Sequence, residues 1–302
     1  MNQVNLDNGR RYGVEVEFVS KLIRSQMADK IQDETGVEMH CVSYSNKSNI
    51  WRLKYDGSVD GSSEYCHGME LVTPILHGED DMLKLKRVVD VIESVSKVNR
   101  SCGLHVHIDV VNASTHNLRK LMKFFSKYEA AIGLLLPESR RGQNNRYCQD
   151  AYCTEKNLYE VHKELNRMKK RHLLSYSEFS GRDKWNFQNY IVHGSFENRA
   201  HSGTLDTAKI ENWVRLSQGM VEAAFTFKGS TIYPDDTTRT YTSKHMLDAL
   251  AKKGVITKDI KAFYKKRFMD LNTKIYNKDK AKWMWARKPS SIRADNSESM
   301  VS

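Results

Sequence analysis

Four short segments of this chain alternate apolar and polar residues, and this alternation constrains the fold more than any other feature. The segments are YGVEVEFV from Tyr12, MELVTP from Met69, GLHVHIDV from Gly103 and HGSFENRAHSG from His193. Such alternation is typical of a β-strand with one buried face. We therefore predict four strands, each with its apolar residues in a core and its polar residues on the opposite face.

The polar faces of these strands carry ionisable groups instead of the Lys, Thr or Ser that an ordinary half-buried strand turns to water. They are Glu15, Glu17, Glu70, His105, His107, Asp109, Glu197 and Arg199. If the strands share one sheet, carboxylates that face each other cannot all stay ionised without a cation. Oxygen-rich sites with few imidazoles suit Mg²⁺ or Mn²⁺ better than zinc, and Mg²⁺ in turn suggests a nucleotide phosphate.

The segments between these strands predict helices and one further strand. Apolar residues recur at helical spacing over 80–98 and 117–136, and residues 154–174 form a plausible charged helix. Asp206 is placed to cap another helix, and 243–284 read as one or two helices with a break at Gly254. A strand is expected over 51–58, ending in an Asp-Gly turn. Because no regular βαβ rhythm is present, we predict an α+β fold, a largely antiparallel sheet with helices on its outer face.

The positive charge of the chain is concentrated near its C-terminus. The net charge is +11, yet residues 1–243 hold 33 Lys and Arg against 31 Asp and Glu, whereas residues 244–302 hold 15 against 6. This region is either a solvated basic helical surface or a contact surface for nucleic acid or an acidic partner. Trp283 and Trp285 in KWMWARK could stack on bases in the second case.

Composition also bears on the compartment. The five cysteines are odd in number and lack CxxC spacing, which favours reduced thiols over a disulfide framework or a zinc site. No run of about 18 apolar residues is present, and the first residues lack the apolar core of a signal peptide. We therefore expect no membrane partner and a cytoplasmic location.

Taken in order, these segments resemble a known family. The matching set is GVEVEF, YDGS, MELVTP, CGLHVHID, SRR followed by RYC, and ENRAHSGTLD leading into IENWV, across about residues 10–225. The chain is similar to the amidoligases, ATP-dependent carboxylate-amine ligases related to glutamate-cysteine ligase and glutamine synthetase. Asn198 departs from the family pattern, but the alternation turns its side chain away from the polar face.

The resemblance implies a fold and a reaction. It implies an antiparallel sheet curved into a funnel, whose inner face holds metal ions, ATP and substrates. ATP would phosphorylate a substrate carboxylate, and an amine would then attack the acyl phosphate to give an amide, ADP and phosphate. The substrates would be an amino acid, a peptide or a related small molecule, and an amidotransferase partner that supplies ammonia is compatible with this scheme.

The resemblance also implies roles for single residues. The metal ligands would be Glu15, Glu17, Glu70 and Glu197. The catalytic residues would be Arg199 at the transferred phosphoryl group, His105 at the metal and phosphate site, and Asp56 near the amine or the metals, with Asp60 as the alternative to Asp56. Contacts to the nucleotide or to a substrate carboxylate would come from His107, Arg140, Arg141 and Arg146. Cys148 matches a family cysteine and is interpreted as structural.

We expect the amidoligase-like catalytic domain to span residues 1–230 and a basic helical extension, packed on or next to it, to span 231–290. A disordered tail is expected over 291–302. Two other functions stay open at this point. The HxH strand could serve a metal-dependent hydrolase, and the basic region could serve a nucleic-acid-binding protein without enzymatic activity.

Overall fold

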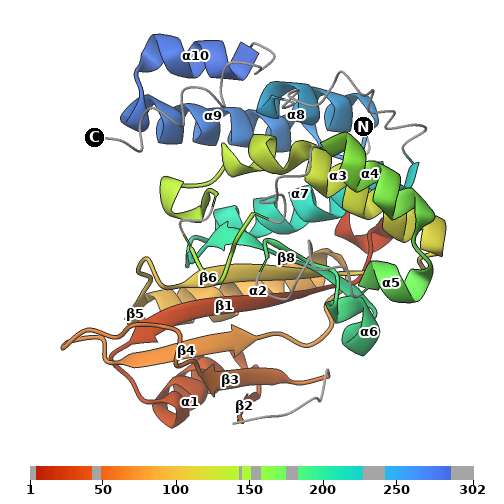
Figure 1. The fold of residues 1–302 in the computed structure, drawn as a ribbon. Coiled ribbons are helices and arrows are strands. Elements are labelled where there is room, and N and C mark those ends of the chain that lie inside the picture. The colour runs from red at the N-terminus through yellow and green to blue at the C-terminus, as the bar shows by residue number, and fades with distance from the viewer. Residues whose placement is uncertain are drawn as a thin grey trace. The chain divides into compact units, whose positions relative to one another are not determined.

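The computed structural model describes residues 5–42, 49–142, 145–150, 158–174, 183–226 and 242–286. Its contacts divide the chain into two compact units. The sheet unit comprises Val4–Val110 and Ser195–Gln218, and the helical unit comprises chiefly Val111–Gly194 and Gly219–Ser302. Figure 1 shows the elements of both units, coloured by their order in the chain.

The sheet unit is built on an open sheet. Its strands are β1 (Tyr12–Ser20), β2 (Met39–Cys41), β3 (Trp51–Tyr55), β4 (His67–Val72), β5 (Ser96–Lys97), β6 (Gly103–Asp109) and β8 (Ser195–Ser202). They lie in the order β2-β3-β4-β1-β6-β8, and β5 pairs with the end of β1. The pairs are antiparallel except β2 with β3, which is parallel. The four predicted alternating strands and the largely antiparallel α+β sheet are therefore confirmed.

One face of this sheet is apolar, as the alternation predicts. Its residues in β1 and β6 are fully buried, among them Val16, Phe18, Val106 and Ile108. The helices of this unit are α1 (Arg24–Thr35), α2 (Gly78–Glu93) and the first part of α7 (Thr207–Thr226). Figure 1 shows α2 behind the sheet. The amide of Asn198 donates to Ser217 Oγ of α7 at 2.9 Å, so its side chain does lie on the face opposite Glu197 and Arg199.

The helix predicted over 80–98 is shorter in the structure. α2 ends at Glu93, and Ser96 and Lys97 pair with Ser20 and Val19 of β1. The spacing of apolar residues describes local periodicity only. It therefore could not predict that Ser96 and Lys97 pair with β1, a strand far earlier in the chain.

The helical unit contains α3 (Thr115–Gly133), η2 (Glu138–Arg140), α4 (Leu158–Arg167), α5 (Lys170–Leu174), β7 (Trp185–Asn186), α6 (Asn189–His193), the end of α7, α8 (Ser243–Lys252), α9 (Lys258–Ile275) and α10 (Lys278–Ala286). Its core is aromatic, with the rings of Phe125 and Trp185 4.7 Å apart. Ser243 and Asn272 donate to backbone carbonyls of Ala131 and Leu134, which fastens α8 and α9 to the α3 segment. The segment is divided into two helices, α8 and α9, by a turn at Gly254, whose φ of 70° favours glycine.

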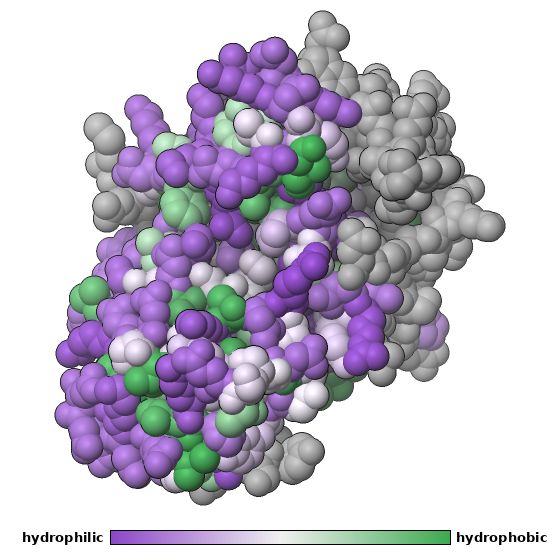
Figure 2. Space-filling view, turned by 90° about the vertical axis from the view of Figure 1, so that its left-hand side faces the viewer, coloured by the Kyte–Doolittle hydropathy of each residue, from purple (hydrophilic) through white to green (hydrophobic). Residues whose placement is uncertain are grey.

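Helices made of described residues include none with the length and apolar character needed to cross a membrane. On the face shown in Figure 2, polar residues dominate and the hydrophobic residues form small separate groups. The division into a catalytic domain over 1–230 and a basic extension over 231–290 stays a prediction. The tail predicted as disordered, 291–302, lies outside the described residues.

Candidate active site on the polar face of the sheet

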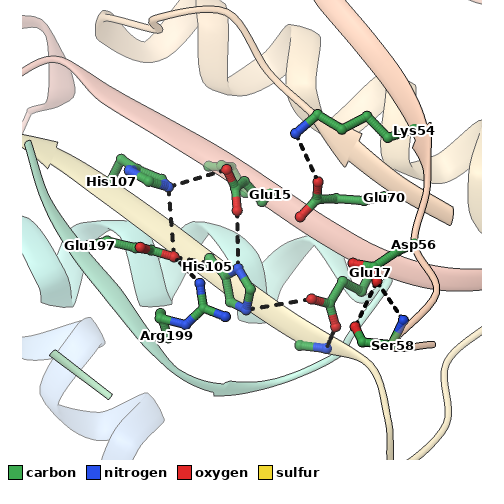
Figure 3. A network of polar contacts seen from close by, with 12 residues as sticks. Glu15, Glu17, Lys54, Asp56, Ser58, Glu70, His105, His107, Glu197 and Arg199 are labelled. Carbon is green, nitrogen blue, oxygen red and sulfur yellow. Dashed lines mark hydrogen bonds and ion pairs between the residues drawn. The ribbon is translucent and has the colours of Figure 1, made fainter. Parts of the chain in front are cut away.

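The register of the strands brings the predicted site residues of the sheet unit together. Glu17 lies directly opposite Glu70, and Glu70 in turn lies opposite Lys54 of β3. Between β1 and β6, Glu15 lies opposite His105, and between β6 and β8, His107 lies opposite Glu197. Figure 3 shows these side chains on one face, and they come from the neighbouring strands β3, β4, β1, β6 and β8. We call the carboxylates of Glu15, Glu17, Asp56, Glu70 and Glu197 the carboxylate row.

His105 is the buried centre of this arrangement. Its side chain is only 5 % exposed, and its Nδ1 lies 3.1 Å from Glu15 Oε2 and 3.6 Å from Glu197 Oε1. Its other nitrogen, Nε2, lies 3.6 Å from Glu17 Oε1. One imidazole therefore contacts carboxylates from β1 and β8, which lie on either side of its own strand.

His107 and Arg199 lie on the β8 side of the face. His107 Nε2 is 3.3 Å from Glu15 Oε1 and 4.0 Å from Glu197 Oε1, and its Nδ1 contacts Ser195 Oγ at 3.3 Å. The geometry gives this buried Nε2 no hydrogen-bond partner among the described residues. Arg199 Nη1 donates to Glu197 Oε1 at 2.6 Å, so Glu197 is shared by a guanidinium and two imidazoles.

The other end of the carboxylate row has different partners. Lys54 Nζ donates to Glu70 Oε2 at 3.2 Å, and the backbone N–H of Gly103 donates to Glu17 Oε2 at 2.5 Å. Asp56 follows β3, and its Oδ1 accepts from both the N–H and the hydroxyl of Ser58, at 2.8 and 2.6 Å. The turn therefore fixes the carboxylate of Asp56 as well as the path of the chain.

A close backbone contact sets the position of the loop that carries Asp56. A Cβ on Gly68 would lie 2.7 Å from the carbonyl oxygen of Val59 and 3.0 Å from that of Asp56. The loop therefore passes over β4 at a point where only a glycine leaves room. Val59 packs with Val19 and Cys102 in a small apolar cluster. Val19 follows Glu17 by two positions in β1, so both side chains lie on the same face of the strand.

Charges on the row shift the pKa values of its members in both directions. Burial alone would raise the pKa of Glu15, but His107 and His105 outweigh it and hold that pKa well below its ordinary value. Burial, Glu15 and Glu17 together raise the pKa of Glu70 well above its ordinary value, against the opposing effect of Lys54. Burial would lower the pKa of His107, yet the Glu15 carboxylate raises it overall.

Three overlapping groups of side chains in the row could each hold a cation, since their ligand atoms lie within 4.8 Å of one another. They are Glu15 with His107 and Glu197, Glu15 with Glu70 and His105, and Glu17 with Asp56 and Glu70. Five carboxylates with two imidazoles suit a hard divalent ion, and Nε2 of His107 faces the carboxylates of Glu15 and Glu197 in ion-pair contacts that lack hydrogen-bond geometry. The side chains therefore fit the Mg²⁺ or Mn²⁺ that the sequence suggests.

The remaining predicted residues have other surroundings. Asp60 is exposed and is absent from these three groups, whereas Asp56 is a member of one. Arg140, Arg141 and Arg146 belong to the helical unit, and their predicted contacts to phosphate or carboxylate stay predictions. Cys148 is buried, which raises the pKa of its thiol and agrees with a structural role. Asp109 pairs with Arg11 at 2.7 Å instead of joining the row.

Sequence reasoning missed two contributors to this face, Lys54 and Gly68, and expected a third, Ser58, only to shape the turn. Lys54 is partner to Glu70, Ser58 holds Asp56, and Gly68 makes room for the loop. The alternation in WRLKY, which places Arg52 and Lys54 on the same face, is a signal that could have revealed Lys54. The role of Gly68 depends on a contact across the chain and leaves no local signal.

A comparison with family models now adds to this geometry. The model described as "Putative amidoligase enzyme" matches residues 8–221. The chain belongs to this amidoligase family. The match includes every member of the carboxylate row together with both imidazoles and Arg199. A comparison with curated proteins finds no match.

Membership in the amidoligase family supports an enzyme of the ligase type that forms amide bonds. It agrees with the resemblance that the ordered motifs suggested. The polar face of the sheet unit is the part of this amidoligase where ionisable side chains from separate strands converge.

Proposed function

We propose that this amidoligase is an ATP- and Mg²⁺-dependent carboxylate-amine ligase that works through an acyl phosphate. The observation that carries the proposal is the carboxylate row with His105, His107 and Arg199, gathered on one face of one sheet in a member of the amidoligase family. A funnel around this face, as in glutamine synthetase and glutamate-cysteine ligase, is part of the proposal.

The three candidate groups would hold the metal ions. Glu15 and Glu70 each belong to two groups, while Glu197, Glu17, Asp56 and the imidazoles each belong to one. Bound divalent ions would neutralise the phosphate oxygens of ATP and the charge that develops during phosphoryl transfer. The row and the two imidazoles supply oxygen and nitrogen ligands, and burial of Glu17, Glu70, His105 and Glu197 keeps these four side chains fixed.

In the proposed reaction a substrate carboxylate oxygen forms a bond to the γ-phosphorus of ATP, and the bond to the β-phosphate oxygen breaks to release ADP. The amine nitrogen then attacks the acyl carbon, and phosphate leaves as the amide forms. Arg199, whose guanidinium is oriented by Glu197, would stabilise the phosphoryl group in transfer. Asp56, at the loop end of the row, would either complete the third metal group or accept the proton that the amine loses.

The test is ADP release by the purified full-length protein with Mg²⁺, ATP and a library of carboxylates and amines, followed by mass spectrometry of the product. We expect ADP release only when a matching acid and amine are both present. Glu15→Gln and Glu70→Gln should each abolish it, because each variant removes a carboxylate from two candidate groups.

Glu64→Gln is the matched control. Glu64 is an exposed carboxylate of the same unit that pairs with Lys21 at 2.5 Å and is outside the row. This variant should keep full activity. Undiminished turnover in both Glu15→Gln and Glu70→Gln would reject the assignment, provided that circular dichroism shows all variants folded.

A metal-dependent hydrolase is the second candidate, because Glu15, His107 and Glu197 would also accept a zinc ion. The two functions differ in their need for nucleotide. Tightly bound zinc together with turnover that does not require ATP would favour the hydrolase, whereas the carboxylate-rich row favours the ligase.

Nucleic-acid binding by the basic region remains a separate proposal. Several lysines of α9 and α10 are exposed, including Lys258, Lys265, Lys274, Lys278 and Lys282. Charge reversal of three of these, by Lys→Glu changes in the full chain, should abolish a salt-sensitive association with an oligonucleotide. Retained binding would exclude this surface.

A further inference from the structure

Lys54 is a positive charge built into the acidic part of the polar face. It lies on β3 directly opposite Glu70 of β4, and its Nζ donates to Glu70 Oε2 at 3.2 Å. The Glu70 side chain is 11 % exposed and the Lys54 side chain 27 % exposed. Among the residues that the structure describes, Lys54 is the cationic side chain paired with this carboxylate.

Glu70 belongs to two candidate metal groups, and each group needs one of its oxygens. One group joins it with Glu15 and His105, and the other with Glu17 and Asp56. A carboxylate has two oxygens, and Lys54 engages one of them. While Lys54 stays in place, a divalent ion at Glu70 Oε2 would have to bind beside the ammonium, 3.2 Å from that oxygen, whereas Oε1 does not contact Lys54. Glu70 can therefore serve one group with full affinity, and the ammonium opposes an ion in the other.

Glu15 is also shared by two candidate groups, but its two oxygens contact imidazoles and not a lysine. Its Oε2 contacts His105 and its Oε1 contacts His107. Each of these imidazoles belongs to a candidate group itself, so it can bind the same ion as Glu15. An ammonium has no lone pair and cannot be a ligand. Lys54 can only compete with a metal ion for its oxygen of Glu70.

We propose that Lys54 is an internal counter-cation that limits the number of divalent ions on the carboxylate row. With its ammonium on Glu70, the row takes up one ion fewer than its three groups allow. The last ion binds only when the ammonium leaves the carboxylate. This inference rests on the proposed function in one respect, namely that the row binds divalent ions. Lys54 is a positioning residue in this scheme, because it acts through Glu70.

The test is a titration of the metal-free, full-length protein with Mn²⁺, in which electron paramagnetic resonance measures free and bound ion without any substrate. Lys54→Met should bind the last Mn²⁺ about tenfold more tightly than the wild type, as expected for the loss of a competitor at the same carboxylate. Lys54→Arg, which keeps a cation opposite Glu70, should restore the isotherm of the wild type.

Lys97→Met is the matched control for the loss of a positive charge. Lys97 is an exposed lysine of the same unit that lies over the ring of Tyr65, 4.4 Å from its centroid, and contacts no member of the row. This variant should change the affinity for Mn²⁺ less than twofold. Equal tightening in Lys97→Met and Lys54→Met would overturn the proposal, since it would show a general effect of charge.

Two further outcomes separate this inference from the proposed function. If Lys54→Met binds the same number of ions with unchanged or weaker affinity, Lys54 supports the site instead of competing with an ion, and the inference fails while the ligase proposal stands. If the wild type binds no Mn²⁺ and Lys54→Met binds none either, both proposals fail.

Discussion

Glu15 and Glu70 are neighbours on adjacent strands, and both are shared by two candidate metal groups. Their pKa values nevertheless move in opposite directions, well below the ordinary value for Glu15 and well above it for Glu70. Burial opposes ionisation at both positions. The difference comes from their partners, because Glu15 faces two imidazoles, whereas Glu70 faces one lysine and two carboxylates.

The two ends of the row therefore differ in the positively charged and imidazole groups that contact their carboxylates. At the histidine end, the guanidinium of Arg199 and the imidazoles of His105 and His107 contact the carboxylates of Glu15 and Glu197. At the lysine end, Glu17, Asp56 and Glu70 share a smaller positive charge. A divalent ion therefore relieves more repulsion at the lysine end, and variants that alter one end only can separate the two.

The largest effect on stability is expected at the histidine end. Arg199→Met removes the guanidinium that donates to Glu197, whose side chain is 2 % exposed. Because a buried carboxylate then loses its strongest partner, the free energy of unfolding should fall by about 3 kcal/mol. Urea denaturation of the metal-free protein measures this. A loss as small as that of a surface ion pair would show that the imidazoles alone hold Glu197.

The next prediction concerns the lysine end. Gly68→Ala places a Cβ against the backbone carbonyls of Asp56 and Val59, so the loop must shift and the unfolding free energy should fall by about 2 kcal/mol. Mn²⁺ binding should weaken at the group that contains Asp56. Gly57→Ala is the control, because a Cβ there meets nothing within 4 Å. Equal behaviour of the two variants in denaturation and metal titration would refute the packing argument.

The third prediction compares the two glutamates by pH. The lowered pKa of Glu15 stabilises the fold above its unfolded pKa, near 4.3, and this contribution disappears as the pH falls through the folded value. The raised pKa of Glu70 has the opposite sign: it costs stability at pH above the folded value and costs nothing once the pH falls to about 4.3.

Without metal at pH 7, Glu15→Gln should therefore be less stable than the wild type by about 1–2 kcal/mol, while Glu70→Gln should be as stable or more stable. Thermal unfolding from pH 4 to pH 8 with EDTA checks both signs. The difference between wild type and Glu70→Gln should shrink as the pH falls. A parallel loss in both variants at every pH would contradict the comparison.

The smallest effect is expected for Ser58→Ala. The hydroxyl of Ser58 donates to Asp56 Oδ1, and the backbone N–H of the same residue keeps its own bond to that oxygen. The free energy of unfolding should fall by about 1 kcal/mol or less. Affinity for the ion at the Asp56 group should fall slightly. An unchanged metal isotherm would show that the backbone bond alone orients Asp56.

Much of the sheet could be predicted because its information is local. Alternation in the segments around Val16, Leu71, Val106 and Phe196 fixed the strands and the face of each polar residue, and the structure confirms these faces. The order of the motifs indicated the family, which the family model confirms over residues 8–221. The convergence of Glu15, Glu70 and His105 followed once the strands were assumed to share a sheet.

What could not be predicted depends on contacts between distant residues. β5 exists because Ser96 and Lys97 meet the end of β1, and the importance of Gly68 comes from a loop that crosses its strand. The pairing of Lys54 with Glu70 requires the register of β3 against β4, which a residue pattern alone does not define.

The discontinuous make-up of the sheet unit has a consequence for synthesis on the ribosome. Residues 111–194 separate β6 from β8, so the strand that carries Glu197 and Arg199 is translated well after its neighbour. At about 5–20 residues per second, β6 remains an open edge for several seconds. During that interval the nascent chain contains Glu15, Glu17, Asp56 and Glu70 of the carboxylate row but not yet Arg199. A bound Mg²⁺ ion could then reduce the repulsion between these carboxylates until β8 is made.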